Sequence, residues 1–253
     1  MSAVARLRQA IRTHGSLGTL RLAAGLASRP LLRPLQQWWV SRYLRVTGRR
    51  FDRQFHVNTT GWIDGEKLDG GANALHATAY AGVVPAPFRM VMDQLKIDFA
   101  KHVFIDFGSG KGRALFLAAQ YPFARIVGVE FSPQLHEVAR ANCQTCRGPI
   151  AIDNRIELYC MDATKYELPA QPAVLFFFNP FDESVMRPIA DQVQESLRRN
   201  PRHVLIVYFW PVARRLWDAL DCLVTVPVRQ PTWAWPAHRG REIVAIWTVK
   251  PFT

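Results

Sequence analysis

The stretch from Val103 to Arg113, which reads VFIDFGSGKGR, constrains the fold of this chain more than any other. Its apolar beginning is typical of a buried strand, and a glycine-dense turn then leads into an expected helix from Arg113 to Gln120. Glycine at Gly108 and Gly110 allows a ligand close to the backbone, because no Cβ stands in the way. Amide groups at the start of the helix then face that ligand. The pattern predicts a strand, turn and helix that bind a nucleotide-type molecule.

The details of the turn narrow the type of ligand. A phosphate-binding P-loop requires Ser or Thr after its lysine, whereas Gly112 follows Lys111 here. The dinucleotide fingerprint GxGxxG requires a third glycine, but Arg113 occupies that position. Asp106, two residues before the first glycine, would lie near a pyrophosphate and instead suits a ligand that carries cationic groups. An oxidoreductase is the weaker alternative, because it rests only on Gly108-x-Gly110 followed by Glu130.

Three further predicted strands each end next to a distinctive polar residue. The strand from Arg125 to Glu130 ends in a carboxylate that can accept hydrogen bonds from both hydroxyls of a ribose. The strand from Arg155 to Cys160 is followed by Met161-Asp162-Ala163, and the strand from Ala173 to Phe178 by Asn179-Pro180-Phe181. Ligands of open α/β sheets bind outside the carboxyl ends of the strands. Four successive strands therefore predict one binding site at that edge.

The turn resembles motif I of the class I S-adenosylmethionine (SAM) methyltransferases, usually written D/E-x-G-x-G-x-G. Asp106, Gly108, Gly110 and Gly112 fill this motif without a gap. The resemblance covers roughly Thr78 to Thr253. It implies a Rossmann-like α/β fold with a seven-stranded sheet of order 3-2-1-4-5-7-6, an antiparallel last strand and helices on both faces. We expect the remaining elements at Ser184–Arg199 (helix) and at His203–Phe209, Cys222–Val228 and Glu242–Val249 (strands).

The resemblance implies SAM as the cofactor and a role for each motif residue. Asp106 and the backbone of the turn would hold the methionine end, and Glu130 would hold the ribose. Asp162 and Ala163 would contact the adenine. The cofactor-binding residues predicted in this way are Asp106, Gly108, Ser109, Gly110, Gly112, Arg113, Glu130, Phe131, Asp162, Ala163 and Asn179.

Tyr80 and Asn179 are the predicted catalytic residues. Tyr80 would close over the methionine end of SAM, with packing against the first helix of the domain as the alternative. Asn179-Pro180-Phe181 resembles the [D/N]-P-P-[Y/F/W] motif of methyltransferases that act on planar amines, in which Asn or Asp accepts hydrogen bonds from the acceptor. The motif is one residue short here, so planar-amine specificity stays open.

The sequence on either side of the glycine turn is loosely similar to that of the non-SET protein-lysine methyltransferases and their uncharacterised bacterial relatives. This similarity rests on the spacing of Tyr80, Pro85 and the glycine turn, and on a helix that begins with Phe131-Ser132-Pro133. In the loop between the last two strands, Trp233 and Trp235 are candidate contacts for the methyl acceptor.

Positive charge is concentrated at the N-terminus. Residues 1–51 contain ten arginines, no lysine and no acidic residue, which leaves 22 basic and 20 acidic side chains for the remainder. These arginines alternate with leucines and with Trp38 and Trp39, and Pro30 and Pro34 interrupt any long helix. Four alternatives are open: an extension packed on the domain, an anionic membrane surface, nucleic acid as partner, and a mitochondrial presequence.

We therefore divide the chain into a basic helical extension (1–51), a pre-core segment that carries the lid (52–95) and the SAM-binding methyltransferase domain (96–253). In the pre-core segment, Phe51-Asp52-Arg53 and Thr59-Thr60-Gly61 are expected to form turns and caps rather than strands.

Cysteine usage and hydropathy limit the class of protein. Four cysteines are too few for a disulfide framework, and Cys143 and Cys146 lack the second pair that a structural zinc site needs. We expect no metal. No stretch approaches the ~18–20 apolar residues of a membrane span. We expect a cytoplasmic protein, with peripheral attachment to a membrane surface left open.

The sequence thus predicts a SAM-dependent methyltransferase (EC 2.1.1 class) that methylates an amine on a protein side chain or a nucleic acid. One alternative is a methyltransferase of a small or membrane-embedded molecule, with residues 1–51 held on the membrane. The other is a catalytically silent SAM-binding module whose basic arm serves assembly.

Overall fold

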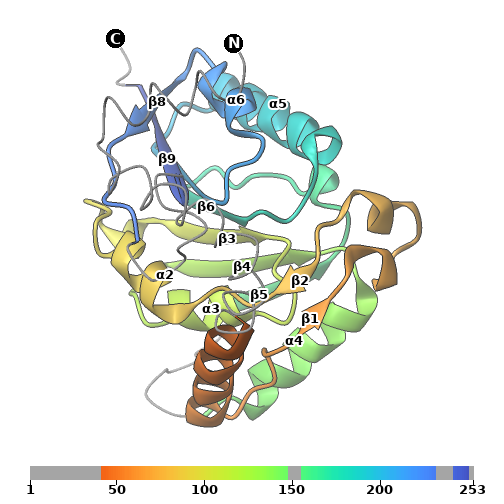
Figure 1. Ribbon diagram of the computed structural model, residues 1–253. Coiled ribbons are helices and arrows are strands. Elements are labelled where there is room, and N and C mark those ends of the chain that lie inside the picture. Colours follow the sequence, from red (N-terminus) through yellow and green to blue (C-terminus); the bar gives the residue numbers. More distant parts are fainter. Residues whose placement is uncertain (1–40, 148–154, 232–241, 251–253) are drawn as a thin grey trace, which may run out of the picture. The chain divides into compact units, whose positions relative to one another are not determined.

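A seven-stranded sheet forms the centre of the protein. The computed structural model describes residues 41–147, 155–231 and 242–250 (Figure 1). The strand order is β5-β4-β3-β6-β7-β9-β8, which confirms the predicted order 3-2-1-4-5-7-6 when these seven strands are numbered along the chain. The strands are β3 (Val103–Phe107), β4 (Arg125–Glu130), β5 (Ile156–Cys160), β6 (Ala173–Phe178), β7 (Val204–Phe209), β8 (Leu223–Val226) and β9 (Val244–Val249).

The register of the sheet brings the predicted strand ends together. β3 is paired in parallel with β4 on one side and with β6 on the other, so that Asp106 lies opposite Gly128 and Phe176. β9 runs antiparallel to both β7 and β8, between which it is inserted. The predicted antiparallel last strand is therefore confirmed. The carboxyl ends of β3, β4, β5 and β6 lie at one edge of the sheet, where ligands of such sheets bind.

The helices begin where the sequence supplies caps. Ser132 accepts a hydrogen bond from the Leu135 amide at the start of α4, and Asp182 accepts one from the Ser184 amide at the start of α5. α2 begins at Pro85, because the fixed φ of proline suits the first helical turn. The helices are α2 (Pro85–Met92), α3 (Arg113–Ala118), α4 (Pro133–Thr145), α5 (Glu183–Arg199) and α6 (Arg214–Asp218).

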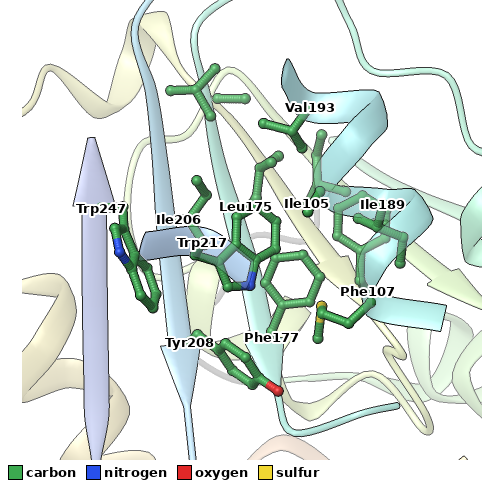
Figure 2. Packing of buried hydrophobic residues seen from close by; sticks show 14 of the residues in the cluster. Ile105, Phe107, Leu175, Phe177, Ile189, Val193, Ile206, Tyr208, Trp217 and Trp247 are labelled. Atoms are coloured by element: carbon green, nitrogen blue, oxygen red, sulfur yellow. The ribbon is translucent and has the colours of Figure 1, made fainter. Parts of the chain in front are cut away.

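Two apolar cores cover the two faces of the sheet. Along β3, Phe104 packs on one face with residues of α2 and α3, whereas Ile105 and Phe107 pack on the other face. Figure 2 shows this second core, in which Trp217 of α6 and Ile189 of α5 lie against the sheet. Burial of side chains of this size stabilises the fold by about 1.5–3 kcal/mol each. Helices on both faces are thus confirmed.

The segment before the sheet differs from the prediction. Residues 41–55 are helical, so the turn predicted at Phe51-Asp52-Arg53 is wrong. Phe51 and Phe55 are spaced by one helical turn, and both are buried in the core with α2 and α3. This helix continues through the boundary that we drew between residues 51 and 52.

Between that helix and α2, the chain forms a small antiparallel pair of strands. β1 (Trp62–Ile63) pairs with β2 (Tyr80–Ala81), and the short 3-10 helices η1 (Gly65–Lys67) and η2 (Gly71–His76) lie between them. Two more 3-10 helices, η3 (Phe99–Lys101) and η4 (Ala163–Lys165), precede β3 and follow β5. The sequence did not predict β1 or β2, because two-residue strands carry no periodic signal.

Some predictions fall outside the described residues. They concern most of the basic extension, which is residues 1–40, and the loop that holds Trp233 and Trp235. Within the described ranges, no helix combines the length and the hydropathy needed to span a bilayer.

Candidate cofactor and acceptor site

The glycine turn after β3 has a backbone that only glycine adopts readily. The φ angles are 80° at Gly108, 55° at Gly110 and 88° at Gly112, all in the left-handed region. The amides of Gly108 and Ser109 donate to the carbonyl of Val129 at 2.9 and 3.1 Å, which ties the turn to β4. The turn is therefore rigidly placed at the edge where β3 and β4 end.

Glu130, at the end of β4, reaches back to the same turn. Its Oε2 accepts a hydrogen bond from the Gly110 amide at 2.7 Å, and its Oε1 accepts one from the Ser132 amide at 2.9 Å. Burial raises the pKa of Glu130 to about 7, although these amide hydrogen bonds act in the opposite direction. The carboxyl group is thus pinned beside the turn and titrates close to neutral pH.

Asp106 is a second buried carboxyl beside Glu130. Only 3% of its surface is exposed, and burial together with the charge of Glu130 raises the pKa of Asp106 well above its usual value. Ionised carboxylates are costly in such surroundings unless a cation or hydrogen-bond donors compensate them. Two such carboxyls at one turn therefore favour a ligand that brings positive charge.

The ring of Tyr80 covers the glycine turn at Gly110. A Cβ added to Gly110 would lie 2.4 Å from Cε2 of the Tyr80 ring, so the ring lies directly on this glycine. The Tyr80 hydroxyl donates to the Thr59 carbonyl at 2.7 Å. The cavity beneath has a volume of about 60 Å³, whereas pockets for drug-sized ligands measure ~300–1,000 Å³. The cavity must therefore widen to admit a nucleoside-sized ligand, and Tyr80 is one of the residues that line it.

The cavity brings together most of the predicted site residues. The predicted residues that line it are Asp106, Gly108, Ser109, Gly110, Arg113, Glu130, Phe131 and Tyr80. Gly112, Asp162, Ala163 and Asn179 lie outside its lining.

Asp162 follows β5, the strand next to β4. Its Oδ1 accepts hydrogen bonds from the amide and the hydroxyl of Thr164 at 2.9 and 2.7 Å, so it caps η4. The Met161 amide donates to the Glu130 carbonyl at 2.9 Å. Asp162 and Ala163 are thus next to the end of β4, and their contact with adenine stays a prediction.

Arg113 uses its side chain for a purpose that the sequence did not indicate. The guanidinium is buried and donates to Thr59 Oγ1 at 2.7 Å, to Thr60 Oγ1 at 3.1 Å and to the Gly82 carbonyl at 3.2 Å. Asp52 lies 3.9 Å away and accepts hydrogen bonds from the amides of both threonines. Arg113 therefore attaches residues 52–60 and 82 to the first helix of the domain, and its contact with the cofactor stays a prediction.

Sequence reasoning missed two carboxylates near the site. Asp52 organises the segment that holds Tyr80, and Asp69 accepts hydrogen bonds from the Ser132 hydroxyl and the Gln134 amide beside Glu130. A carboxylate in a polar, glycine-rich segment was the only signal. The partners of Asp69 lie 63 and 65 residues further along the chain, and a single sequence does not reveal such pairings.

Asn179 lies at the end of β6, next to two residues of the cavity lining. It has a φ of 46° at the exit of β6, and its carbonyl accepts a hydrogen bond from the Thr78 hydroxyl. Its side-chain Oδ1 is buried without a hydrogen-bond partner among the described residues. Pro180 and Phe181, which follow it, line the cavity. An unused buried acceptor atom next to a cleft is costly and suits a donor on a bound molecule.

A family match covers the part of the chain that contains this cavity's glycine turn. Residues 104–200, from β3 to just beyond α5, match the family described as "Methyltransferase domain". This part of the chain is a class I methyltransferase domain. Its cofactor is S-adenosylmethionine. The methyltransferase domain thus contains the glycine turn, Asp106, Glu130, Asp162 and Asn179.

Several solved structures are similar to this chain, and one of them, with a TM-score of 0.50, supports the same fold. The putative methyltransferase yhhF from Escherichia coli is 12% identical, with a TM-score of 0.50 over 76% of this chain and 100% of that chain. An RNA methyltransferase from Salinibacter ruber, solved with S-adenosyl-L-homocysteine, is 19% identical over 69% of this chain and 96% of its own, with a TM-score of 0.43. The tRNA (m1A58) methyltransferase TrmI from Aquifex aeolicus is 12% identical over 68% and 70%, with a TM-score of 0.45. A search of curated proteins found no significant match.

The cleft of the methyltransferase domain fits its cofactor. SAM carries a sulfonium and an ammonium group, which would compensate the buried carboxyls Asp106 and Glu130. The left-handed glycines allow it to approach the backbone closely. Among the described residues, no three His, Cys, Asp or Glu side chains are grouped so as to hold a metal ion.

Proposed function

We propose that this methyltransferase domain methylates an amine on a protein side chain or a nucleic acid. The observation that carries the proposal is the Oδ1 of Asn179, which is buried beside Pro180 and Phe181 and has no hydrogen-bond partner in the described part of the chain. An amide oxygen at this place accepts a hydrogen bond from an acceptor N–H and orients the nitrogen lone pair toward the cofactor. The aromatic ring of Phe181 provides an apolar wall for the acceptor.

The cofactor-binding residues take the roles expected from the motifs. Asp106 and the backbone from Gly108 to Gly112 hold the methionine end, and Glu130 accepts hydrogen bonds from the ribose hydroxyls. Asp162 and Ala163 contact the adenine. The burial of both carboxyls and the position of the turn between β3 and β4 support this assignment.

Methyl transfer from a sulfonium is an in-line displacement, so the protein contributes orientation and exclusion of water. Bound SAM supplies the electrophilic methyl group. Tyr80, once displaced from Gly110, remains attached to the chain at β2 and closes the cleft over the methionine end. Asn179 holds the acceptor on the opposite side. No covalent nucleophile is needed.

The arginine-rich N-terminus favours an anionic partner, which keeps a second function open. Ten arginines without an acidic residue in 1–51 suit nucleic acid as substrate or an anionic membrane surface as an anchor. In the second case, the acceptor would be a small or membrane-embedded molecule. We propose that residues 1–51 act as such a basic extension, and that residues 52–95 carry the lid of the domain in 96–253.

The acceptor class is tested with methyl-labelled SAM. The full chain is incubated with protein, RNA and lipid fractions of a cell extract, and we expect label in protein or RNA. Label in the lipid fraction alone would contradict the proposed acceptor class. The variant Asn179→Ala should keep its affinity for SAM and lose transfer; equal loss of both would assign Asn179 to the cofactor instead.

A further inference from the structure

The helix that ends at Phe55 carries a line of arginines on its outer side (Figure 1). Arg45, Arg49 and Arg53 recur at four-residue spacing, which places them on one face of the helix. All three are exposed, and so is Arg50 beside them. We call Arg45, Arg49 and Arg53 the arginine stripe.

The charge of the stripe is not compensated by the protein around it. Among the residues that the structure describes, no carboxylate forms an ion pair with any of the three arginines. Asp52, the one acidic residue between positions 45 and 55, is turned inward, where its carboxylate lies 3.9 Å from Arg113. It also accepts hydrogen bonds from the amides of Thr59 and Thr60. The outer side of the helix therefore presents positive charge to a partner.

The apolar side of the same helix is already used inside the protein. Phe51 and Phe55 are 3% and 1% exposed and pack in the core with α2 and α3. A helix that lies in a membrane interface buries its apolar side in the lipid. Between residues 45 and 55, Val46 is the single large apolar side chain that stays exposed. The stripe thus offers charge without an apolar anchor, which favours a partner in water over a lipid surface.

The geometry of the stripe fits a polymer with regularly spaced charges. Four residues of an α-helix rise about 6 Å, so the three arginines follow one another at even intervals along one line. The planar guanidinium matches two phosphate oxygens at once. A nucleic acid carries phosphates at regular intervals along its backbone, whereas the carboxylates of an acidic protein surface have no such repeat.

The inner side of the helix contacts the segment that borders the cofactor cleft. A Cβ added to Gly48 would lie 2.6 Å from Thr60 Oγ1, so the helix backbone lies directly on Thr60. The carbonyl of Thr59 accepts the hydrogen bond from the Tyr80 hydroxyl, and the Tyr80 ring lies on Gly110. A polymer bound along the stripe is therefore held beside the segment that carries Tyr80.

We propose that the arginine stripe binds the phosphate backbone of a nucleic acid. This inference rests on the proposed function, because it selects nucleic acid from the partners named there. Contacts to phosphates fix the position of a nucleic acid without reading its sequence. The stripe thus holds the polymer, and the choice of the methylated group is left to the cleft.

The test measures the binding of bulk tRNA by the full chain at several salt concentrations. Each phosphate contact contributes about 0.7–0.9 to the slope of log K against log salt concentration. The triple variant Arg45→Gln, Arg49→Gln, Arg53→Gln should therefore reduce this slope by about 2–3. Glutamine has a helix propensity similar to that of arginine. Six arginines remain in residues 1–40, so binding should weaken rather than disappear.

A matched control removes the same charge from another helix. Arg187→Gln, Arg198→Gln and Arg199→Gln change exposed arginines of α5 that pair with Glu183 or Glu195, and this variant should keep the slope of the wild type. An equal reduction in both triple variants, or an unchanged slope in the stripe variant, would overturn the proposal. Flotation with vesicles of phosphatidylcholine and phosphatidylserine is the second probe. A stripe variant that loses vesicle binding but keeps the tRNA slope would assign the stripe to a membrane instead.

Binding and methyl transfer are measured separately, and calorimetry with SAM checks that both triple variants are folded. If the wild type binds tRNA through the stripe but transfers label to neither protein nor RNA, the proposed methylation fails and the stripe stands. If label enters RNA while the two triple variants bind tRNA alike, the proposed function stands and the stripe fails.

Discussion

At the residue scale, the site depends on groups that are costly without a ligand. Asp106 and Glu130 are buried carboxyls whose pKa values are both raised, and Asn179 has a buried acceptor atom without a partner among the described residues. Natural proteins retain such groups where binding or catalysis requires them. The three residues lie at the ends of neighbouring strands, so one ligand and its acceptor would satisfy all of them.

Glu130 predicts how binding depends on pH. The pKa of folded Glu130 is about 7, above 4.5 for the free group, so its contribution to stability is fully present below about pH 4.5 and lost as the pH rises toward 7. Cationic SAM favours the ionised form, so its binding should release protons below pH 7 and its affinity should rise with pH up to that value. Calorimetry in buffers of different ionisation enthalpy measures this release. Glu130→Gln should reduce it, leaving only the part due to Asp106; an affinity independent of pH between about 6 and 8 would contradict the assignment.

Gly110 offers a test with a matched control. Gly110→Ala and Gly71→Ala both place a Cβ on a backbone with positive φ, 55° and 63°, at a similar cost of about 1–2 kcal/mol. Around Gly71 the added Cβ meets nothing within 4 Å, whereas at Gly110 it enters the space between the turn and Tyr80. In urea unfolding we expect the same backbone cost in both variants and a further loss of stability in Gly110→Ala, because its Cβ must displace the Tyr80 ring. Only Gly110→Ala should lose SAM binding. Normal binding by Gly110→Ala would disprove the site.

At the scale of elements, residues 52–84 form a strap over the glycine turn. Arg113 and Asp52 attach the strap at Thr59 and Thr60, and Tyr80 closes it over Gly110. The attachment and the closing contact are separate. The strap can therefore open at Tyr80 and remain attached at Arg113.

Tyr80→Phe tests this opening. The variant keeps the ring but removes the hydrogen bond to the Thr59 carbonyl, which is worth about 0.5–1.5 kcal/mol. Because the closed strap excludes the cofactor, its weakening should tighten the apparent affinity for SAM by roughly 2- to 10-fold. Stopped-flow binding should show that the association rate accounts for the gain. Weaker binding by Tyr80→Phe would mean that the hydroxyl serves the bound state.

Some elements were predictable from the sequence, and others were not. β4 and β6 have the predicted bounds, because their apolar runs lie between clear turns and are buried on both faces. The turn at Gly108–Gly112 was recognisable because its residues interact locally. The strap was not, because Arg113 meets Thr59, and Ser132 meets Asp69, across more than fifty residues. Tyr80 was identified as a lid from the resemblance alone; its contact with Gly110 required the structure.

At the scale of the whole molecule, most of the N-terminal arginines and the cofactor cleft belong to different parts of the chain. Residues 45–253 form a compact unit that includes the complete cleft, whereas most of the N-terminal arginines precede it. Counterion release makes a block of arginines the main determinant of binding to polyanions. Binding to polyanions and binding of SAM should therefore be separable by truncation.

Removal of residues 1–40 tests this separation. The shortened chain should bind SAM within about 2-fold of the full chain, since the lining of the cleft is unchanged, and should elute from heparin at lower salt. Flotation with anionic and neutral vesicles, and tRNA binding at two salt concentrations, then distinguish membrane from nucleic acid. Loss of SAM binding on truncation would show that the extension is part of the site.

The most direct test of the cofactor site is calorimetric titration of the full chain with SAM and S-adenosylhomocysteine, with NAD as the control. We expect micromolar binding of both, at one site per chain, and no heat with NAD. Binding of NAD, or the absence of binding by SAM and S-adenosylhomocysteine, would contradict the assignment of the cleft between β3 and β4 to this cofactor.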